Sequence, residues 1–441
     1  MQVLILQFVD PARIGGLAEF SHSIGVMSAL LKADGFETAL VAMPGFAPAA
    51  LREAILRQRP QYVLTDLDVW NVSAARRTIG EIAQQYALPV AVFGTYATCS
   101  PEPAVSIPGV HALLRGEYEQ SAAALLGAMR DGADPAGLEG VWVHTDSGLA
   151  RGALRAPAPL DSLPFPDRGL FDFGRIVRTT REAPFKVARG CPHWCAYCVN
   201  DWYSDLYGDP PVRRRSVSHV LDEIDKVRAE WPGVENVKFY DHAFAADDAW
   251  LEEFAWEYPR RCGLPWRCHI RLIDVTERRA ELLAAGGCRW THTHLGSGSR
   301  FIREEVLAMF PSDEKIVSAC RTLRAAGLRV AGEVFLGSPY ESEITLEETL
   351  SLVRQAELDA VDPRVFFPAP ATRAAELCEE NGWISGRGDE NYWLGRSVLD
   401  MPSLPAAQID AAVTAFRSLL KRPQETALRR LLDKFRPRGR R

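Results

Sequence analysis

The sequence predicts an α/β protein with two successive strand-helix domains and a small helical C-terminal region. In residues 1–130, apolar runs such as VLILQF alternate with helical patterns, which is typical of a doubly wound, Rossmann-like (flavodoxin-like) parallel sheet. After a linker at 131–184, rich in Pro, Gly, Ala and Arg, the alternation restarts and gives six strand-helix units over 185–385. Six units suffice for an open, partial TIM-like barrel. Residues 386–441 form the helical C-terminal region, whose purpose the sequence does not indicate.

The first domain is expected to contain five buried strands. The apolar runs that predict them are 3–8, 37–43, 62–67, 89–94 and 111–116, with helical patterns near 20–34, 48–58, 72–86 and 118–130. Runs that are apolar throughout indicate strands covered on both faces, as in parallel sheets. Ligands of such sheets bind at the carboxyl ends of the strands.

The second domain repeats this pattern. The expected strands are 185–189, 237–241, 265–271, 288–294, 328–337 and 361–368. The first helix is expected over 217–230, with one apolar face formed by Val220, Leu221, Ile224 and Val227. Thr345 and Glu348 have the spacing of a capping box, which predicts a helix start there.

The composition is that of an ordinary soluble globular protein. A net charge of -6 gives no general reason to expect nucleic-acid binding, and we interpret the basic stretch at 421–441 as a solvated amphipathic helix with a frayed end. No apolar run approaches the ~20 residues of a membrane span. The first ten residues are interpreted as a strand and not as a signal peptide. Nine cysteines without a secretion signal indicate a cytoplasmic protein that uses thiols for metal binding or chemistry.

Three of these cysteines lie in the stretch RGCPHWCAYCVN. Cys191, Cys195 and Cys198 are spaced C-x3-C-x2-C, with no fourth cysteine nearby. Disulfides cannot use three cysteines, and zinc would need a fourth ligand, for which His193 is the local candidate. A 4Fe–4S cluster accepts three cysteines and keeps one iron open. The spacing and the place of the loop after a barrel strand favour the cluster over zinc or inert thiols.

This loop resembles that of the radical S-adenosylmethionine (SAM) superfamily, including the aromatic Tyr197 before the last cysteine. The resemblance implies that the open iron binds the amino and carboxylate groups of SAM. It also implies that an electron from the cluster, supplied by an external donor such as flavodoxin or ferredoxin, cleaves SAM to methionine and a 5'-deoxyadenosyl radical.

Further segments resemble the subgroup that has an N-terminal cobalamin-binding domain. Four stretches match its motifs in the right order, namely 92–119, 160–171, 213–224 and 337–342. The resemblance implies that residues 1–130 bind cobalamin. The residues expected to contact it are Asp10, Gly15, Gly16, Thr65, Gly94, Thr95, Tyr96, Gly116 and Glu117.

Glycine at Gly15, Gly16 and Gly94 would let a flat corrin approach the backbone, although ordinary turns would also explain it. Free-standing cobalamin modules carry D-x-H-x-x-G, whose histidine ligates cobalt. This chain has Ala12 at that position, so we expect no protein imidazole below the cobalt. His22 could replace it, but a lone helical histidine is more often a surface or packed residue.

The stretch HLGSGS at 294–299 departs from the pattern G-I-E-S-G-S of the family. His294 replaces a glycine and Gly296 replaces the glutamate, while Ser297 is kept as an expected cofactor contact. Glu333 on the next strand could supply the missing carboxylate; an exposed or ion-paired role is the alternative.

Other polar residues lie near the ends of barrel strands, where such barrels hold their chemistry. His292 and His294 share one face with Trp290, and that face is either the barrel interior, with substrate or acid-base roles, or the helix-covered side. Tyr240 and Asp241 end the second strand and are expected to be catalytic; Arg271 ends the third and could bind a carboxylate of SAM or substrate.

Together these features predict a cobalamin-dependent radical SAM methyltransferase that methylates an unactivated carbon of a small molecule, such as a natural product or a tetrapyrrole. The alternatives are a cyclase or rearrangement enzyme without methyl transfer, a radical SAM enzyme whose first domain has lost cobalamin, and a non-catalytic sensor. SAM cleavage by the reduced protein distinguishes the sensor from the enzymes.

Overall fold

The computed structural model describes all residues except 10–19, 209–211, 243 and 420–441. The chain divides into two compact units, which are described separately below. The first unit comprises Met1–Lys186, Trp202–Glu235 and Gly388–Trp393, and the second comprises Val187–Asp201, Asn236–Arg387 and Leu394–Arg441. The expected cobalamin contacts Asp10, Gly15 and Gly16, as well as Ala12, lie outside the described residues.

The first unit contains a seven-stranded sheet of order β2-β1-β3-β4-β5-β6-β7. Its first five strands are parallel, and their order 2-1-3-4-5 is that of flavodoxin-like folds, which confirms the predicted fold class. The strands are β1 (Gln2–Phe8), β2 (Glu37–Met43), β3 (Tyr62–Asp66), β4 (Val90–Phe93), β5 (Val110–Leu114), β6 (Val141–Thr145) and β7 (Gly148–Arg151).

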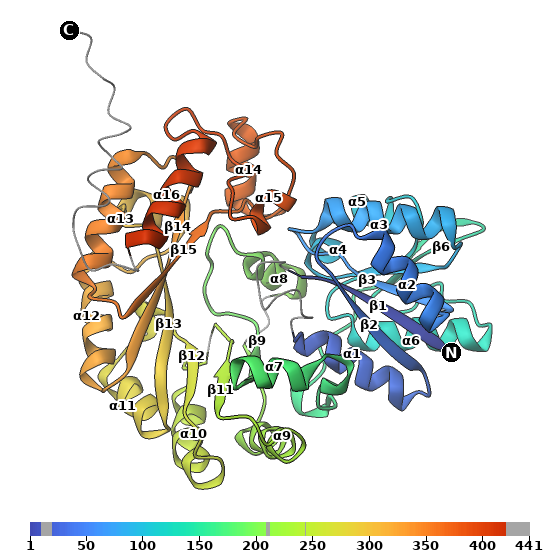
Figure 1. The fold of residues 1–441 in the computed structure, drawn as a ribbon, viewed down its shortest axis with the longest axis horizontal. Helices are drawn as coiled ribbons and strands as arrows, with labels where there is room; N and C mark the ends of the chain where they lie inside the picture. Colours follow the sequence, from blue (N-terminus) through green and yellow to red (C-terminus); the bar gives the residue numbers. More distant parts are fainter. Residues whose placement is uncertain (10–19, 209–211, 243, 420–441) are drawn as a thin grey trace. The chain divides into compact units, whose positions relative to one another are not determined.

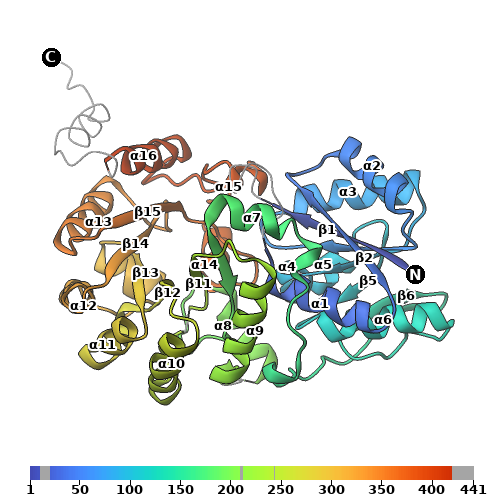
Figure 2. The same cartoon turned by 60° about the horizontal axis from the view of Figure 1, so that its bottom comes forward.

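Helices cover both faces of this sheet, as the fully apolar strands require. In Figures 1 and 2, α2 (Pro48–Gln58) and α3 (Val72–Gln85) lie on one face, and α1 (His22–Ala33) and α6 (Glu119–Asp131) lie on the other. The short helices α4 (Thr95–Cys99) and α5 (Pro101–Val105) follow β4. Leu4, Leu6, Val63 and Val92 are fully buried in the core between strands and helices.

The segment expected to be a linker contains regular structure. The antiparallel hairpin β6–β7 extends the sheet beyond β5, a feature that the sequence did not reveal. The 3-10 turns η2 (Leu160–Ser162) and η3 (Arg168–Leu170), the helix α7 (Phe173–Thr180) and the strand β8 (Glu182–Phe185) follow it.

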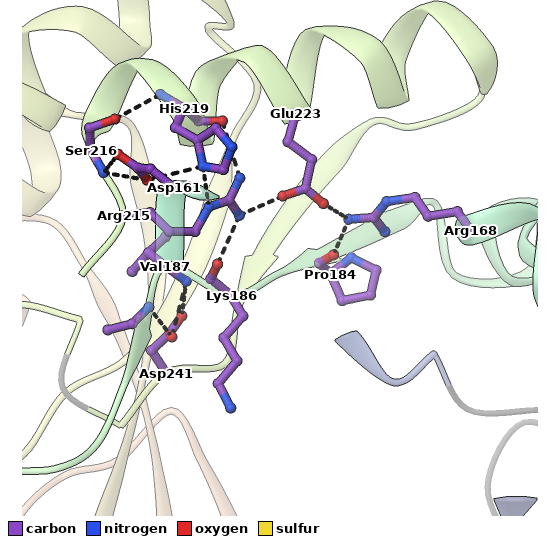
Figure 3. A network of polar contacts seen from close by, with 11 residues as sticks. Asp161, Arg168, Pro184, Lys186, Val187, Arg215, Ser216, His219, Glu223 and Asp241 are labelled. Atoms are coloured by element: carbon purple, nitrogen blue, oxygen red, sulfur yellow. Dashed lines mark hydrogen bonds and ion pairs between the residues drawn. The ribbon is translucent and has the colours of Figure 1, made fainter. Parts of the chain in front are cut away.

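Two segments that resemble family motifs are joined by a buried charge cluster in the first unit (Figure 3). Glu223 of α9 (Val217–Glu230) accepts from Arg168 at 2.7 Å and from Arg215 at 2.5 Å, and all three side chains are at most 4% exposed. Asp161 accepts from the backbone N–H of Ser216, the residue that caps α9. The stretches 160–171 and 213–224 therefore hold each other in place, because each supplies hydrogen-bond partners to the other.

A C-terminal segment also belongs to the first unit. Asp389 accepts from the backbone N–H of Ser73 at 2.9 Å, in the first turn of α3. Trp393, in the short helix α15 (Glu390–Trp393), donates to the carbonyl of Trp70 at 2.9 Å, and the two rings meet edge to face. These contacts attach residues 388–393 to the loop after β3.

The second unit contains the parallel strands β11 (Asn236–Phe239), β12 (Trp266–His269), β13 (Cys288–Gly296), β14 (Arg329–Leu336) and β15 (Ala360–Val365), which are neighbours in that order. Helices α10 (Asp248–Arg261), α11 (Glu277–Ala285), α12 (Asp313–Ala325) and α13 (Glu343–Gln355) connect successive strands and lie along one face of the sheet (Figures 1 and 2). This succession confirms the predicted strand-helix repeat.

Aromatic packing fixes which face of the strands meets the helices. Phe239 of β11 and Trp266 of β12 are buried and contact Phe254 of α10, with ring centroids 5.5 Å apart. Because side chains alternate along a strand, Lys238 and Arg267 lie on the opposite face, which we call the inner face.

Some expected elements begin or end elsewhere. The predicted strand 185–189 is divided between β8, which ends at Phe185, and the two-residue strand β9 (Ala188–Arg189). The predicted capping box at Thr345 is wrong, because the Ser342 and Thr345 side chains form the box and the helix begins at Glu343. Phe301 precedes η5 (Ile302–Val306), and α14 (Arg373–Glu380) and α16 (Ala406–Leu419) follow β15. In the described part of the chain, no helix is long and apolar enough to cross a membrane.

Candidate active site

The three-cysteine loop lies between β9 and α8 (Val199–Tyr207), and all of it belongs to the second unit. Backbone bonds hold it in place: Ala196 donates to the carbonyl of Leu307 at 3.0 Å, and Ala374 donates to the carbonyl of Ala196 at 3.0 Å. Cys195 is buried, while Cys191 and Cys198 are half-buried. The loop is thus fixed by backbone hydrogen bonds, with one thiol buried and two half-buried.

Thiolates in these surroundings need a compensating positive charge. Burial raises the pKa of Cys191 and raises that of Cys198 to about 11. Arg271, two residues after the end of β12, donates from Nη2 to the Sγ of Cys195 at 3.0 Å. The raised pKa values favour the protonated thiols. A bound metal reverses this preference because it deprotonates its thiol ligands. The donor set therefore fits an iron–sulfur cluster.

A single zinc ion fits less well. His193, the expected fourth ligand, has its Nε2 3.0 Å from the Oδ2 of Asp274. Among the described residues, no three His, Cys, Asp or Glu side chains form a group that could hold one metal ion. A 4Fe–4S cluster binds each thiolate at a different iron, so its ligands need not converge on one point.

Tyr197 and His294 connect the cysteine loop with β13. The Tyr197 ring lies 4.9 Å from Phe335 and 5.6 Å from His294, measured between centroids, and His294 lies 4.3 Å from Phe335. His294 is therefore on the inner face, and His292 shares it because it alternates with the buried Thr291 and Thr293. This decides between the two orientations left open by the sequence.

Both ring nitrogens of His294 are buried without a hydrogen-bond partner. Its Nδ1 lies 3.5 Å from the Oε1 of Glu333. Burial, followed by the nearby Arg271 and His242, lowers the pKa of His294 well below its ordinary value. The ring is therefore neutral, and its approach to Glu333 is neither an ion pair nor an aligned hydrogen bond.

Four other expected site residues of the second unit make contacts within the protein. Asp241 accepts from the backbone N–H groups of Val187 and Ala188 at 2.7 to 3.0 Å, so it holds the strand that leads into the cysteine loop (Figure 3). Tyr240 lies beside it, half-buried. Ser297 is fully buried and receives a bond from the N–H of Ser299. Glu333 lies 3.5 Å from Arg364, as the ion-paired alternative expects.

In the first unit, the expected cobalamin contacts lie at the carboxyl ends of the strands. Thr65 ends β3 together with Asp66; its hydroxyl is buried and has no hydrogen-bond partner in the structure. In the sheet order 2-1-3, the ends of β1 and β3 are the topological switch point at which such sheets bind ligands. A ligand with hydrogen-bonding groups, such as cobalamin, fits this position.

Two carboxylates at this edge were not predicted from the sequence. Burial, and next the Asp68 carboxylate, raise the pKa of Asp66 well above its ordinary value. Burial also raises the pKa of Asp68, whereas its hydrogen bond with Thr95 lowers it. The stretch LTDLDVW carries a signal for them, namely acidic residues where an apolar strand ends. A neutral carboxyl group can donate a hydrogen bond to a ligand.

The two expected glycines of this edge are required by neighbouring protein groups. Gly94 has φ +117°, and a Cβ there would lie 2.9 Å from the carbonyl oxygen of Leu67. At Gly116, φ +81°, a Cβ would lie 2.1 Å from the hydroxyl of Tyr207. The same hydroxyl accepts from the N–H of Glu117 at 2.9 Å. Packing of Tyr207 therefore explains Gly116 without a ligand. Tyr96 is half-buried, and His22 is buried at the start of α1.

A family model described as the radical SAM superfamily matches residues 185–353. An uncharacterized methyltransferase of Pyrococcus horikoshii, PH0819, is 24% identical over 345 residues, or 76% of this chain and 73% of that protein. The anaerobic magnesium-protoporphyrin IX monomethyl ester cyclase of Rubrivivax gelatinosus is 24% identical over 396 residues, or 82% and 68%. Several other curated relatives are matched over 38% to 49% of their own length.

Among solved structures, the radical SAM methyltransferase TsrM from Kitasatospora setae, with cobalamin and a 4Fe–4S cluster bound, superposes with a TM-score of 0.67. It is 18% identical, and the match covers 88% of this chain and 79% of TsrM. This likeness shows the fold, and the family model covers the strand-helix repeat with the three-cysteine loop. Residues 185–353 therefore form a radical SAM domain, and the chain has the fold of the cobalamin-bound TsrM structure.

Proposed function

We propose that this protein is a cobalamin-dependent radical SAM methyltransferase that methylates an unactivated carbon of a small molecule. The observation that supports it best is a partly buried three-cysteine loop in a chain that also has a doubly wound sheet with an unsatisfied hydroxyl at its switch point. Cys191, Cys195 and Cys198 would bind three irons of a 4Fe–4S cluster and leave the fourth for SAM. Thr65, Asp66 and Asp68 would face cobalamin.

When bound, the cluster and SAM supply the radical that removes hydrogen from the substrate, and cobalamin carries the methyl group. The residues of the chain position these groups. Arg271 donates to Cys195, which stabilises the thiolate form that a cluster requires. Asp241 holds the backbone before the loop, and Tyr197 and Phe335 enclose one side of it. His294 would present a neutral imidazole to the reacting molecules.

The first experiment tests the cluster. Anaerobically reconstituted protein should bind about four irons, and the reduced protein should convert SAM to 5'-deoxyadenosine. Cys195→Ala should lose the iron–sulfur absorbance and all 5'-deoxyadenosine formation. Cys262→Ala removes a half-buried cysteine outside the loop and should change neither. A cluster retained in Cys195→Ala would contradict the assignment.

The second experiment separates methyl transfer from the cyclase alternative, which the Rubrivivax relative and the altered stretch 294–299 support. A methyltransferase of this type consumes one SAM as methyl donor, so protein loaded with cobalamin and reduced should form S-adenosylhomocysteine. A cyclase should form 5'-deoxyadenosine but no S-adenosylhomocysteine. Absence of cobalamin binding by the loaded protein would instead favour a first unit that has lost the cofactor.

We further propose that an external protein, such as flavodoxin or ferredoxin, reduces the cluster in a reducing cytoplasm. None of the nine cysteines, all of which are in the described part of the chain, forms a disulfide, in keeping with such a compartment. A reduced flavodoxin system should then support 5'-deoxyadenosine formation in place of a chemical reductant such as dithionite.

A further inference from the structure

The loop after β3, residues 67–71, directly follows the switch point of the first unit's sheet. In this loop, Asp68 accepts from the backbone N–H of Val69 at 3.0 Å and is hydrogen-bonded to Thr95, one of the residues expected to contact cobalamin. The side chain of Asn71 accepts from the backbone N–H of Asp68 at 2.9 Å. Asn71 therefore holds the part of the loop from which the Asp68 carboxylate reaches Thr95.

The start of α3 is capped by a residue from a distant part of the chain. Asn71 is the N-cap residue of α3, a position whose side chain usually accepts from the second or third N–H of the helix, but it makes no such bond. The second N–H, that of Ser73, donates instead to the Oδ2 of Asp389 at 2.9 Å, 316 residues away in sequence. Asp389 belongs to the segment 388–393, which we call the strap. The strap thus satisfies the helix end, and the oxygen of Asn71 is used for Asp68.

Further contacts of the strap fix the Asp389 carboxylate. Its Oδ1 accepts from the backbone N–H of Glu390 at 3.1 Å, and the Glu390 side chain pairs with Arg77, one turn further along α3. The Trp393 indole donates to the carbonyl of Trp70 at 2.9 Å, and the two rings meet edge to face. The strap is therefore attached both to α3 and to the loop that precedes it.

We propose that the strap, through Asp389, positions the cobalamin-facing residues of the loop 67–71. The inference rests on the proposed function, in which Asp68 faces cobalamin. Without the Asp389 carboxylate, the side chain of Asn71 can turn to cap α3, since asparagine is among the best N-cap residues. It then releases the N–H of Asp68, and the loop loses the bond that fixes it. Asp389 is thus a positioning residue that acts through Asn71.

The first experiment measures cobalamin affinity. Hydroxocobalamin is added to the whole protein, and its binding is followed by equilibrium dialysis. Asp389→Ala should bind it about tenfold more weakly, the size expected when a helix cap is lost. Asp172→Ala is the matched control, because Asp172 caps α7 in the same unit by accepting from the N–H of Arg175 at 3.3 Å. This control also loses a helix cap, but it should keep the wild-type affinity.

A double-mutant cycle tests whether Asp389 acts through Asn71. Asn71→Ala should weaken hydroxocobalamin binding to a similar extent, and adding Asp389→Ala to it should weaken binding by less than about twofold more. Losses that multiply in the double variant would overturn the proposal. Wild-type affinity in Asp389→Ala, or equal weakening in Asp172→Ala, would overturn it as well.

Hydrogen exchange separates a failure of this proposal from a failure of the proposed function. In protein without cobalamin, Asp389→Ala should speed exchange at the N–H of Asp68 about tenfold, and Asp172→Ala should not. A wild-type protein that binds no hydroxocobalamin would contradict the proposed function and the cobalamin role of the strap, and faster exchange would then establish only its hold on the loop. Unchanged exchange in Asp389→Ala would refute that hold even where cobalamin binds.

Discussion

Two buried polar groups of this protein differ in how their hydrogen-bonding atoms are used. Around Glu223, both carboxylate oxygens accept from arginines, and the guanidinium of Arg168 is also enclosed by the rings of Phe20, Phe173 and Phe185 at 4.3 to 4.8 Å. Around His294, both ring nitrogens are buried without a partner. A carboxylate whose two oxygens both have partners stabilises the fold, whereas a group with no partner costs free energy that a bound ligand can recover.

The largest effect on stability is expected for Glu223→Ala. The change leaves Arg168 and Arg215 with buried charges and no carboxylate, which costs about 3–5 kcal/mol. Urea unfolding should show this loss, with the midpoint moved to lower urea. Glu230→Ala removes a half-exposed carboxylate from the same helix and should cost under about 1 kcal/mol. Equal losses in the two variants would mean that the Glu223 cluster is not a structural element.

Asp241 lies in the second unit but behaves like Glu223, because its oxygens are occupied by backbone N–H groups. Asp241→Asn turns one acceptor into a donor that faces N–H groups, so we expect a loss of about 1.5–3 kcal/mol. Asp134→Asn also changes an aspartate that accepts from a backbone N–H, but at an exposed turn, and should cost little. If Asp241→Asn unfolds like the wild type yet stops SAM cleavage, the residue is catalytic as the sequence suggested.

Glu341 is intermediate between Glu223 and His294, because one of its oxygens accepts from the N–H of Gly337 while the other is buried without a partner. Burial raises its pKa from the ordinary 4.5 to about 8. A raised acid pKa means that the folded state binds the proton more tightly, so its contribution to stability is complete below pH 4.5 and is lost as the pH rises to about 8. Glu341→Gln should remove this slope and unfold at higher urea than the wild type at pH 8.

The expected gain of Glu341→Gln at pH 8 exceeds about 1.4 kcal/mol, the value of one pKa unit. Glu347→Gln, exposed on the following helix, should leave the pH dependence unchanged. A variant at Glu341 that keeps the wild-type slope would show that another group titrates.

Much of the fold could be predicted because apolar periodicity records which faces are buried. The strands of both units, the helix over 217–230 and the cysteine loop all follow from local patterns. The hairpin β6–β7 and the packing of Tyr207 on Gly116 could not be predicted, because they depend on partners distant in sequence. The polar side chains of β12 on the inner face were missed although their signal was present, since Arg267 and His269 alternate with apolar residues in PWRCHIR.

The smallest stability effect, and the sharpest test of the comparison, is expected for His294→Gln. Neither ring nitrogen makes a hydrogen bond, so its replacement should change the free energy of unfolding by less than about 1 kcal/mol. His144, whose Nε2 bonds to the carbonyl of Val105 at 3.1 Å, is the matched histidine, and His144→Gln should cost about 1 kcal/mol.

In reaction rate the order of the two variants should be reversed: His294→Gln should be impaired and His144→Gln should not. If the neutral His294 ring faces the reacting molecules, His294→Gln should slow 5'-deoxyadenosine or S-adenosylhomocysteine formation by about 10²-fold, the contribution of a positioned acid or base. His144→Gln, in the first unit's outer hairpin, should not. A His294 variant that loses stability while reacting at the wild-type rate would place this ring with Glu223 among the structural groups, and its unpartnered nitrogens would then be a cost that packing against Phe335 offsets.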